Sequence, residues 1–348
     1  MDFNTILEAG NLEGKRVLVR VDWNVPIENG VVMDDFRIKK SLPTIEYLQK
    51  AGAKIVLISH HDTENETLKT VFEYVKNLLP ITFVEPSNLM LLENLFLNEG
   101  EKQNSRDFAV KLASKADIFV NEAFSESHRE YASIIGLPKL LPSYAGLQFY
   151  EEVKQLSNAF YPKHPFLFVL GGAKFETKLP ILDKFLNIAD NIFVGGALAN
   201  DFFKEEGQDV GSSLVSEGDF NLKEKLHPPT GGGKIILPTD TILEGTRIVD
   251  AGPKTIESLK SKVESAKFIL WNGPLGEFEK GFKTSTLELA KLIADSSAET
   301  IVGGGDTLSA IKELNLLDKF SFVSTGGGAM LDFLALGTLP GIEALKRK

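Results

Sequence analysis

Short apolar runs alternate with segments of helical periodicity along most of the chain. In the first half, apolar or β-branched runs predict strands at residues 16–22, 54–59 and 117–121. Helical spacing is found in the segments at residues 38–51, 66–79 and 108–114. Strands that alternate with helices over short connections form a parallel sheet covered by helices on both faces. The pattern therefore predicts an α/β fold.

The same pattern restarts in the second half. Residues 143–160 have the periodicity of one long amphipathic helix, and the steps Tyr161-Pro162 and His164-Pro165 favour its end there. Beyond them, short apolar strands are predicted at residues 166–170, 191–194, 234–237, 267–271, 300–302 and 321–324. A chain of 348 residues is long enough for about two domains. We place these domains at residues 1–142 and 161–335, with an interdomain helix at 143–160.

The composition limits the partners. Asp and Glu number 48 against 38 Lys and Arg, a formal net charge of −10. This balance argues against a nucleic acid or an anionic membrane, while a small anion needs only a local basic patch. The lack of cysteine excludes disulfides, thiolate catalysis and cysteine–zinc sites, and is compatible with an intracellular protein. We expect no signal peptide and no membrane span.

Paired glycines follow several strands of the second half. The stretch PFLFVLGGAKFETK breaks from a buried strand at Gly171-Gly172 into a helix on which Lys174 and Lys178 share one face. Similar turns occur in GGAL, NGPLG, GGGDT and TGGGA. Because ligands of parallel sheets bind beyond the carboxyl ends of the strands, these turns favour a surface for a nucleotide and its phosphates. The alternative is that they only make tight turns beside solvated lysines. A dinucleotide fingerprint and a Walker loop are both absent.

Two acidic residues lie in these turns. Asp306 opens the helix after the GGG sequence, where it is expected to cap the helix, to hold Mg²⁺ on a nucleotide, or both. Glu279 follows NGPLG and either hydrogen-bonds a ribose or is an ordinary exposed loop residue.

Polar residues also follow the strands of the first half. These residues are Asp22, Asn24, Arg37, His60 and Arg129. Arginine and histidine at a shared sheet edge suit a small anion with carboxylate or phosphate groups. Each of them singly is also typical of an ordinary surface or structural position.

The order of the motifs resembles that of the phosphoglycerate kinases. The matching segments cover almost the whole chain: VRVDWNVP, DDFRIKKSLPTI, LISH, LLENL, FVNEAF with HR following, LGGAKFETK, VGGAL, DAGPKT, LWNGPLGEFE, IVGGGDT and STGGGA. The resemblance implies two doubly wound, Rossmann-like domains joined by a hinge helix, with residues 336–348 returning to the N-terminal domain. It also implies that the N-terminal domain binds 3-phosphoglycerate or 1,3-bisphosphoglycerate, and that the C-terminal domain binds ATP or ADP with Mg²⁺.

The resemblance further implies roles for single residues. Asp22, Asn24 and Arg37 would hold the hydroxyl and carboxylate end of the substrate, and His60 and Arg129 would lie at its phosphate. Lys174 and Lys178 would contact the nucleotide phosphates and the transferred group. The nucleotide would be flanked by Gly172, Gly195, Gly196, Asn272, Pro274, Glu279, Gly304, Gly305 and Thr307, with Asp306 at the metal. Residues 326–328 would offer backbone N–H groups to the phosphoryl group, and the catalytic set would comprise Arg37, Lys174, Lys178, Gly327 and Gly328.

The implied reaction needs no general base. The acceptor is a carboxylate, which is ionised at neutral pH because its pKa is about 4. Catalysis can therefore rest on positioning and charge stabilisation. Substrates held on separate domains require closure, which also excludes water. The resemblance implies a cytoplasmic, monomeric enzyme of glycolysis and gluconeogenesis.

Two arginines of the family pattern are absent. The sequence after LISH is His61-Asp62-Thr63-Glu64 where the family has LGRP, and Phe96 follows LLENL where the family has arginine. Each missing arginine removes about 1.5–3 kcal/mol of binding to the substrate's phosphate. The nearby candidates to compensate for this loss are Lys39, Lys40, Arg106 and Lys139. Residues 218–247 are also shorter than the family pattern.

Three hypotheses follow from these departures. The chain is a phosphoglycerate kinase with a rearranged phosphate contact, a homologue that phosphorylates a different carboxylate, or a nucleotide-binding protein without catalysis. The retained lysines and the GGGDT and TGGGA turns favour the two enzymes over the binding protein. The missing arginines count against the first hypothesis. A dehydrogenase would lack its fingerprint here.

Overall fold

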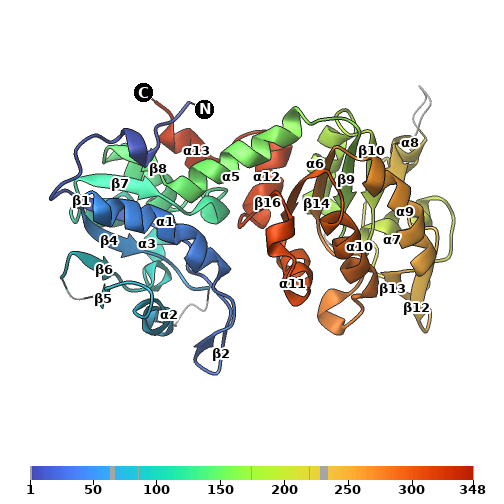
Figure 1. Cartoon of the computed structure of the whole chain (residues 1–348), viewed down its shortest axis with the longest axis horizontal. Coiled ribbons are helices and arrows are strands. Elements are labelled where there is room, and N and C mark those ends of the chain that lie inside the picture. Colours follow the sequence, from blue (N-terminus) through green and yellow to red (C-terminus); the bar gives the residue numbers. More distant parts are fainter. Residues whose placement is uncertain are drawn as a thin grey trace. The chain divides into compact units, whose positions relative to one another are not determined.

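The chain forms two compact units. The computed structural model describes residues 2–62, 67–84, 86–173, 175–218, 220–227 and 234–347, so that Lys174 and Thr63-Glu64 lie outside the described residues. One unit consists of Met1–Lys154 with Leu336–Lys348, and the other of Gln155–Ala335 (Figure 1). The division falls inside helix α5 (Leu147–Ser157). Within the described ranges, no helix has the length and apolar character needed to cross a membrane.

Six parallel strands form the sheet of the first unit, in the order β5-β6-β4-β1-β7-β8. The strands are β1 (Arg16–Arg20), β4 (Lys54–Ile58), β5 (Thr82–Phe83), β6 (Leu89–Leu91), β7 (Ile118–Asn121) and β8 (Ser143–Ala145). A short antiparallel hairpin joins β2 (Ile27–Glu28) to β3 (Val31–Val32). The helices are α1 (Phe36–Lys50), α2 (Lys69–Val75), α3 (Glu99–Lys102), α4 (Arg106–Ala113) and α13 (Pro340–Leu345).

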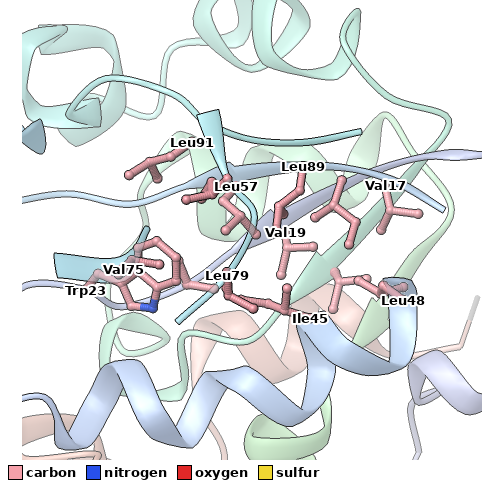
Figure 2. Close-up of a cluster of buried hydrophobic side chains, with 14 of the residues drawn as sticks. Val17, Val19, Trp23, Ile45, Leu48, Leu57, Val75, Leu79, Leu89 and Leu91 are labelled. Atoms are coloured by element: carbon pink, nitrogen blue, oxygen red, sulfur yellow. The ribbon is translucent and has the colours of Figure 1, made fainter. Parts of the chain in front are cut away.

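The central strands of this sheet are buried on both faces. Successive residues of a strand point to opposite faces, so Val19 of β1 belongs to one hydrophobic cluster and Leu18 to another. The first cluster includes Ile45 and Leu48 of α1, which point toward the strands in Figure 2. The second cluster includes Leu112 of α4. Helices therefore cover both faces of a parallel sheet, which confirms the predicted fold class.

The second unit repeats this architecture. Its parallel sheet has the order β11-β10-β9-β14-β15-β16. The strands are β9 (Phe166–Leu170), β10 (Asn191–Val194), β11 (Ile235–Ile236), β14 (Phe268–Asn272), β15 (Glu299–Gly303) and β16 (Phe322–Val323). The helices are α6 (Phe175–Phe185), α7 (Leu198–Glu205), α8 (Leu222–Leu226), α9 (Pro253–Ser265), α10 (Thr284–Ala294), α11 (Gly305–Glu313) and α12 (Gly328–Leu336). All residues of β9 and β14 are buried, as expected from the apolar sequence of β9 and from that of β14 up to Asn272.

Local predictions fail at three places. The predicted helix at residues 143–160 is wrong at its start, because residues 143–145 form β8 at the sheet edge and α5 begins only at Leu147. Pairing with β7 satisfies the backbone of this segment, a long-range contact that helical periodicity does not register. Helix α2 is shorter than the predicted 66–79. The antiparallel pair β12 (Thr241–Glu244) and β13 (Arg247–Ala251) is absent from the prediction.

The C-terminal segment lies in the first unit. Phe3 and Lys346 form an antiparallel bridge, and Arg347 Nη2 lies 3.1 Å from Glu8 Oε1. The N–H of Gly341 in α13 donates to the carbonyl of Ser127 (2.8 Å). These contacts join the two ends of the chain within one compact unit.

A buried carboxylate holds the start of α5. Glu122, which follows β7, accepts hydrogen bonds from the N–H groups of Gln148 and Phe149 (3.2 Å each) and from the hydroxyl of Thr44. These are N–H groups of the first turn, which have no partner inside the helix. A Cβ atom at Gly146 would lie 1.9 Å from Glu122 Oε2, so this position has no room for a side chain.

We therefore expect Gly146→Ala to lower the free energy of unfolding by about 1–3 kcal/mol through overpacking against Glu122. Urea denaturation followed by circular dichroism measures this loss. In a Glu122→Ala background the same change should have a much smaller effect, because the carboxylate is gone. Equal losses in the two backgrounds would contradict this account of the α5 start.

Candidate active site

The carboxyl edge of the first sheet carries most of the polar residues selected in the first half. β4, β1 and β7 are adjacent and parallel, so the segments that follow them emerge at one edge. Trp23, after β1, is fully buried. Its backbone N–H donates to Ser59 Oγ (2.9 Å), and its indole N–H donates to Ser41 Oγ (2.9 Å). These two bonds fix the loops after β1 and β4 against α1.

Asp22 and Arg37 form the centre of this cluster. Arg37 Nη1 lies 3.0 Å from Asp22 Oδ2 and donates to the carbonyl of Asn24 (3.1 Å). Burial alone would raise the pKa of Asp22, but Arg37 and the Ser125 hydroxyl hold this pKa below its ordinary value. The Asn24 side chain donates to Asp62 Oδ2 (2.6 Å). Arg37 is thus held in place at the edge of the cluster by a carboxylate and a carbonyl.

A buried arginine that the sequence analysis did not select holds His60. Arg20, the last residue of β1, is fully buried, and its Nη2 lies 2.9 Å from His60 Nδ1. Its other nitrogens donate to Ser133 Oγ (2.9 Å) and to the carbonyl of Val21 (2.6 Å). Ser133 donates in turn to the buried carboxylate of Glu101 through its N–H (3.0 Å) and its hydroxyl. The chain of contacts from Glu101 to His60 is therefore continuous.

This contact decides the tautomer of His60. A guanidinium has only donors, so Nδ1 accepts and the proton of the neutral ring is on Nε2. Burial, and next the charge of Arg20, lower the pKa of His60 to about 3. The Nε2 atom lies 3.8 Å from both Asp62 Oδ1 and Glu126 Oε1. Burial, and next the charge of Asp22, raise the pKa of Glu126 to about 7. His60 therefore offers a neutral N–H donor and not a positive charge.

Arg129 lies apart from these contacts, exposed in the turn after Glu126, where its backbone N–H donates to the carbonyl of Glu126 (2.9 Å). Among the residues that the sequence analysis missed, Arg20 carried a signal, because an arginine ending a buried strand needs fixed partners. Glu101 and Ser133 carried none.

Three glycine turns meet at the carboxyl edge of the second sheet. The N–H of Gly171 donates to the carbonyl of Asn272 (2.9 Å), and the N–H of Gly172 donates to that of Pro274 (2.9 Å). Gly273 has a φ of +101°, and a Cβ there would lie 2.3 Å from the Gly171 oxygen. The turns after β9 and β14 therefore pack backbone against backbone, which only glycine permits here.

The turn after β10 joins the same arrangement. A Cβ at Gly196, where φ is +63°, would lie 2.6 Å from the Gly172 nitrogen, and one at Gly195 would lie 2.8 Å from Leu275 Cδ2. The N–H of Leu198, which opens α7, donates to the carbonyl of Gly172 (3.2 Å). The glycines of the GGAK, GGAL and NGPLG motifs, which are distant in sequence, thus form one surface.

Lys178 lies beneath this surface. Its side chain is buried, with 8% exposed, and its ammonium donates to the carbonyl of Gly171. Burial lowers the pKa of Lys178 to about 8, and the charge of Asp306 opposes this shift. Lys174, the other lysine predicted for this face, lies outside the described residues.

Asp306 is half-buried near Lys178. The predicted capping role is wrong, because the N-cap of α11 is Gly304, with a φ of +104°, and Asp306 lies in the first turn. Burial, and next the charge of Glu279, raise the pKa of Asp306, and Lys178 lowers it. Asp306, Glu279 and Lys178 are thus close enough to interact electrostatically. The described residues contain no cluster of three His, Asp or Glu side chains suited to a metal ion.

The neighbouring polar side chains support the turns. Thr307 is fully buried, and its Oγ1 accepts the N–H of Gly273 (2.9 Å). Asn272 donates to the carbonyl of Gly303 (3.1 Å). Both residues therefore position the loops of β14 and β15 against each other.

Three glycines, residues 326–328, follow β16. The N–H of Gly326 donates to Ser324 Oγ (3.0 Å). Gly327 has a φ of +49° and Gly328 is the first residue of α12, as Gly305 is of α11. The N–H groups at such helix starts favour an anion.

The two sheet edges differ in chemistry. One has an arginine and a neutral histidine donor, groups that suit a small acid. The other has glycine turns, a buried lysine and an aspartate, groups that suit phosphates and a metal ion. A parallel α/β chain with these features falls in the class of phosphotransferases.

Comparison with known proteins makes this assignment specific. A family model described as phosphoglycerate kinase matches residues 7–336. A phosphoglycerate kinase of Leptospira biflexa is 38% identical over 389 residues, covering 99% of this chain and 98% of the relative. One of Fervidobacterium nodosum is 38% identical and covers 97% of both chains. The structure of the phosphoglycerate kinase from Coxiella burnetii matches with a TM-score of 0.85 and 33% identity, over 99% of this chain and 98% of that one. The chain belongs to the phosphoglycerate kinase family.

This chain is also shorter than its Leptospira relative. The alignment of the two spans 389 residues, more than the 348 of this chain, so the relative contains internal segments that this chain lacks.

The neutral state of His60 gives a testable pH dependence. Because its pKa is about 3 in the folded protein and about 6.5 when unperturbed, the unfolded chain binds this proton first as the pH falls. The free energy of unfolding should therefore decrease from pH 6.5 downward, by up to about 1.4 kcal/mol per pH unit from this residue. His60→Gln should make the decrease shallower. Nitrogen-15 spectra of the imidazoles should show His60 protonated at Nε2 at pH 6, and a His60 that titrates near 6.5 would contradict the assignment.

Proposed function

We propose that this chain catalyses the reversible transfer of a phosphoryl group between ATP and the carboxylate of 3-phosphoglycerate, with 1,3-bisphosphoglycerate and ADP as products. The near full-length match to the phosphoglycerate kinase family supports this activity over both alternatives, a different carboxylic acid and a binding protein without catalysis. The observation that carries the site assignment is the buried Lys178 under the glycine turns, with Asp306 close by.

The proposed role of Lys178 is to stabilise charge on the nucleotide phosphates. Its ammonium now donates to the carbonyl of Gly171, at the turn where a phosphate would lie. In a buried position such a charge acts more strongly on a phosphate than it would in water. Lys174 and the N–H groups of Gly327 and Gly328 are proposed to complete this stabilisation. The remaining nucleotide contacts are proposed at Gly172, Gly195, Gly196, Asn272, Pro274, Glu279, Gly304, Gly305 and Thr307.

Magnesium is part of the proposal. Mg²⁺ is commonly held by one or two carboxylates together with phosphate oxygens, so the half-buried Asp306 fits this use without further protein ligands. When bound, the ion neutralises charge on the phosphates. Asp306 would orient the nucleotide by holding the Mg²⁺ ion on its phosphates. Lys178 would counter the negative charge of the nucleotide.

In the first unit, Arg37 is proposed to bind the carboxylate end of phosphoglycerate. Its position is set by Asp22 and by the carbonyl of Asn24, and the Nε2–H of His60 adds a neutral donor. Asp22 and Asn24 are proposed to contact the substrate's hydroxyl, and Arg129 its phosphate. Because the attacking carboxylate is already ionised, none of these residues has to act as a base. We further propose that the enzyme is cytoplasmic and monomeric.

Lys178→Met should lower kcat by about 100- to 1,000-fold, as expected for loss of a group that stabilises transition-state charge. The assay follows NADH consumption through an added dehydrogenase, with MgATP and 3-phosphoglycerate as substrates. Lys291→Met is the matched control, since Lys291 is an exposed residue of α10 paired with Glu288. Unchanged turnover in Lys178→Met would overturn the assignment of this lysine, and no turnover in the parent protein would overturn the proposed function.

Asp306→Asn tests the metal contact. Loss of one charged ligand should raise the Mg²⁺ concentration needed for half-maximal rate by about 10- to 100-fold, by the energies of charged hydrogen bonds. The measurement is a Mg²⁺ titration at fixed ATP. Asp295→Asn, in the same unit at the end of α10, is the control. Identical titration curves for the parent and Asp306→Asn would remove Asp306 from the metal site.

A further inference from the structure

Two aromatic side chains, Phe96 and Tyr131, lie beside His60 and are called the aromatic wall below. Phe96, in the turn Leu95–Leu97, lies with its ring centroid 4.5 Å from that of His60. Tyr131 packs edge-on against Phe96, at 5.6 Å between ring centroids and an interplanar angle of 86°. This wall carries no charge, although it borders the cluster that contains Arg37 and His60.

A lysine lies on this wall. Lys102 Nζ is 4.4 Å from the centroid of the Phe96 ring, within the range of a cation–π contact. Lys102 is the last residue of α3. The preceding Glu101 is fully buried and bonded to the N–H and hydroxyl of Ser133, so the backbone that carries Lys102 is anchored.

The charges of the cluster show why such a lysine matters. Arg20 and Arg37 supply two positive charges, while Asp22, Asp62 and Glu126 supply up to three negative ones. These groups by themselves do not attract an acid that carries both a carboxylate and a phosphate.

Arg129 is a second cation beside the aromatic wall. Burial, and next the charge of Glu126, raise the pKa of Tyr131, whereas Arg129 and Lys102 lower it. Both cations are therefore near enough to act on the ring that packs against Phe96. Of the lysines considered in the sequence analysis, Lys39 pairs with Asp35 (2.8 Å) and Lys40 lies over the Phe36 ring (5.4 Å).

We propose that Lys102, held over Phe96, is a specificity-determining residue that binds the phosphate group at the non-reacting end of phosphoglycerate, with Arg129 as a second cation. This inference rests on the proposed function. An ammonium against an aromatic face sheds part of its water and keeps N–H donors for an anion. Lys102 thus discriminates the phosphorylated acid from glycerate, which lacks the phosphate.

The test compares two acceptors with two matched variants. Lys102→Met should raise the KM for 3-phosphoglycerate by about 10- to 100-fold, the loss of one hydrogen bond between charged groups. With 3-phosphoglycerate, the KM for MgATP and the kcat should stay within about twofold of the parent values. The kcat/KM for glycerate should not change, because glycerate has no phosphate for Lys102 to contact. Lys102→Arg should restore most of the affinity. The control is Lys111→Met, an exposed lysine of α4 in the same unit.

Several outcomes would overturn the inference. If Lys102→Met raises the KM for 3-phosphoglycerate no more than Lys111→Met does, Lys102 is not a phosphate ligand, while the proposed function stands. If Lys102→Met impairs glycerate and 3-phosphoglycerate equally, its role is structural and the inference fails. If the parent turns over neither acid, the proposed function fails as well. Calorimetric binding of 3-phosphoglycerate to the parent and to Lys102→Met gives an independent reading, and equal affinities would also overturn the proposal.

Discussion

Every strand of the two six-stranded sheets runs parallel to its neighbours, and this constraint determines where the chemistry can lie. Parallel strands must be joined by crossovers, so helices cover both faces and the central strands are mostly apolar, with polar residues at their ends. Polar side chains are then confined to the segments that leave the strand ends. In the first unit this places Asp22, after β1, and His60, after β4, in one cluster. In the second unit it brings together the glycine turns that follow β9, β10 and β14.

Both sites depend on charged side chains that are buried among fixed partners. Arg20 has a partner for each of its nitrogens. Burial, and next the charge of Arg20, keep His60 neutral, and the contact with Arg20 places the proton on Nε2. Lys178 has a carbonyl partner and a nearby aspartate. A buried charge without such partners would be strongly destabilising, so each one is tied to groups on other elements. The same contacts that stabilise the charges also fix the orientation of these side chains.

The first site differs from the family pattern where Phe96 replaces an arginine, and the structure shows what surrounds that replacement. The phenyl ring packs against His60 and Tyr131, and the Lys102 ammonium lies over it. A cation is therefore present near the same cluster, but it comes from a different element, the end of α3. Under the proposed role of Lys102, the site keeps its ligand class while its residues are redistributed.

The sequence by itself determined the α/β class, the two repeats of the strand–helix pattern and the family, because apolar periodicity and the GGAK, GGGDT and TGGGA turns are local properties of the chain. Together with the family motifs it also indicated Arg37, His60, Lys178 and Asp306 as candidate site residues. Only the tertiary structure showed that Glu122 holds the start of α5, that Gly304 and not Asp306 caps α11, and that Arg20 and Glu101 lie behind His60. It alone brought Lys102 onto Phe96. These features are pairings between residues distant in sequence or choices among neighbouring backbone geometries, and the energies that decide them arise from packing and burial, which no local pattern records.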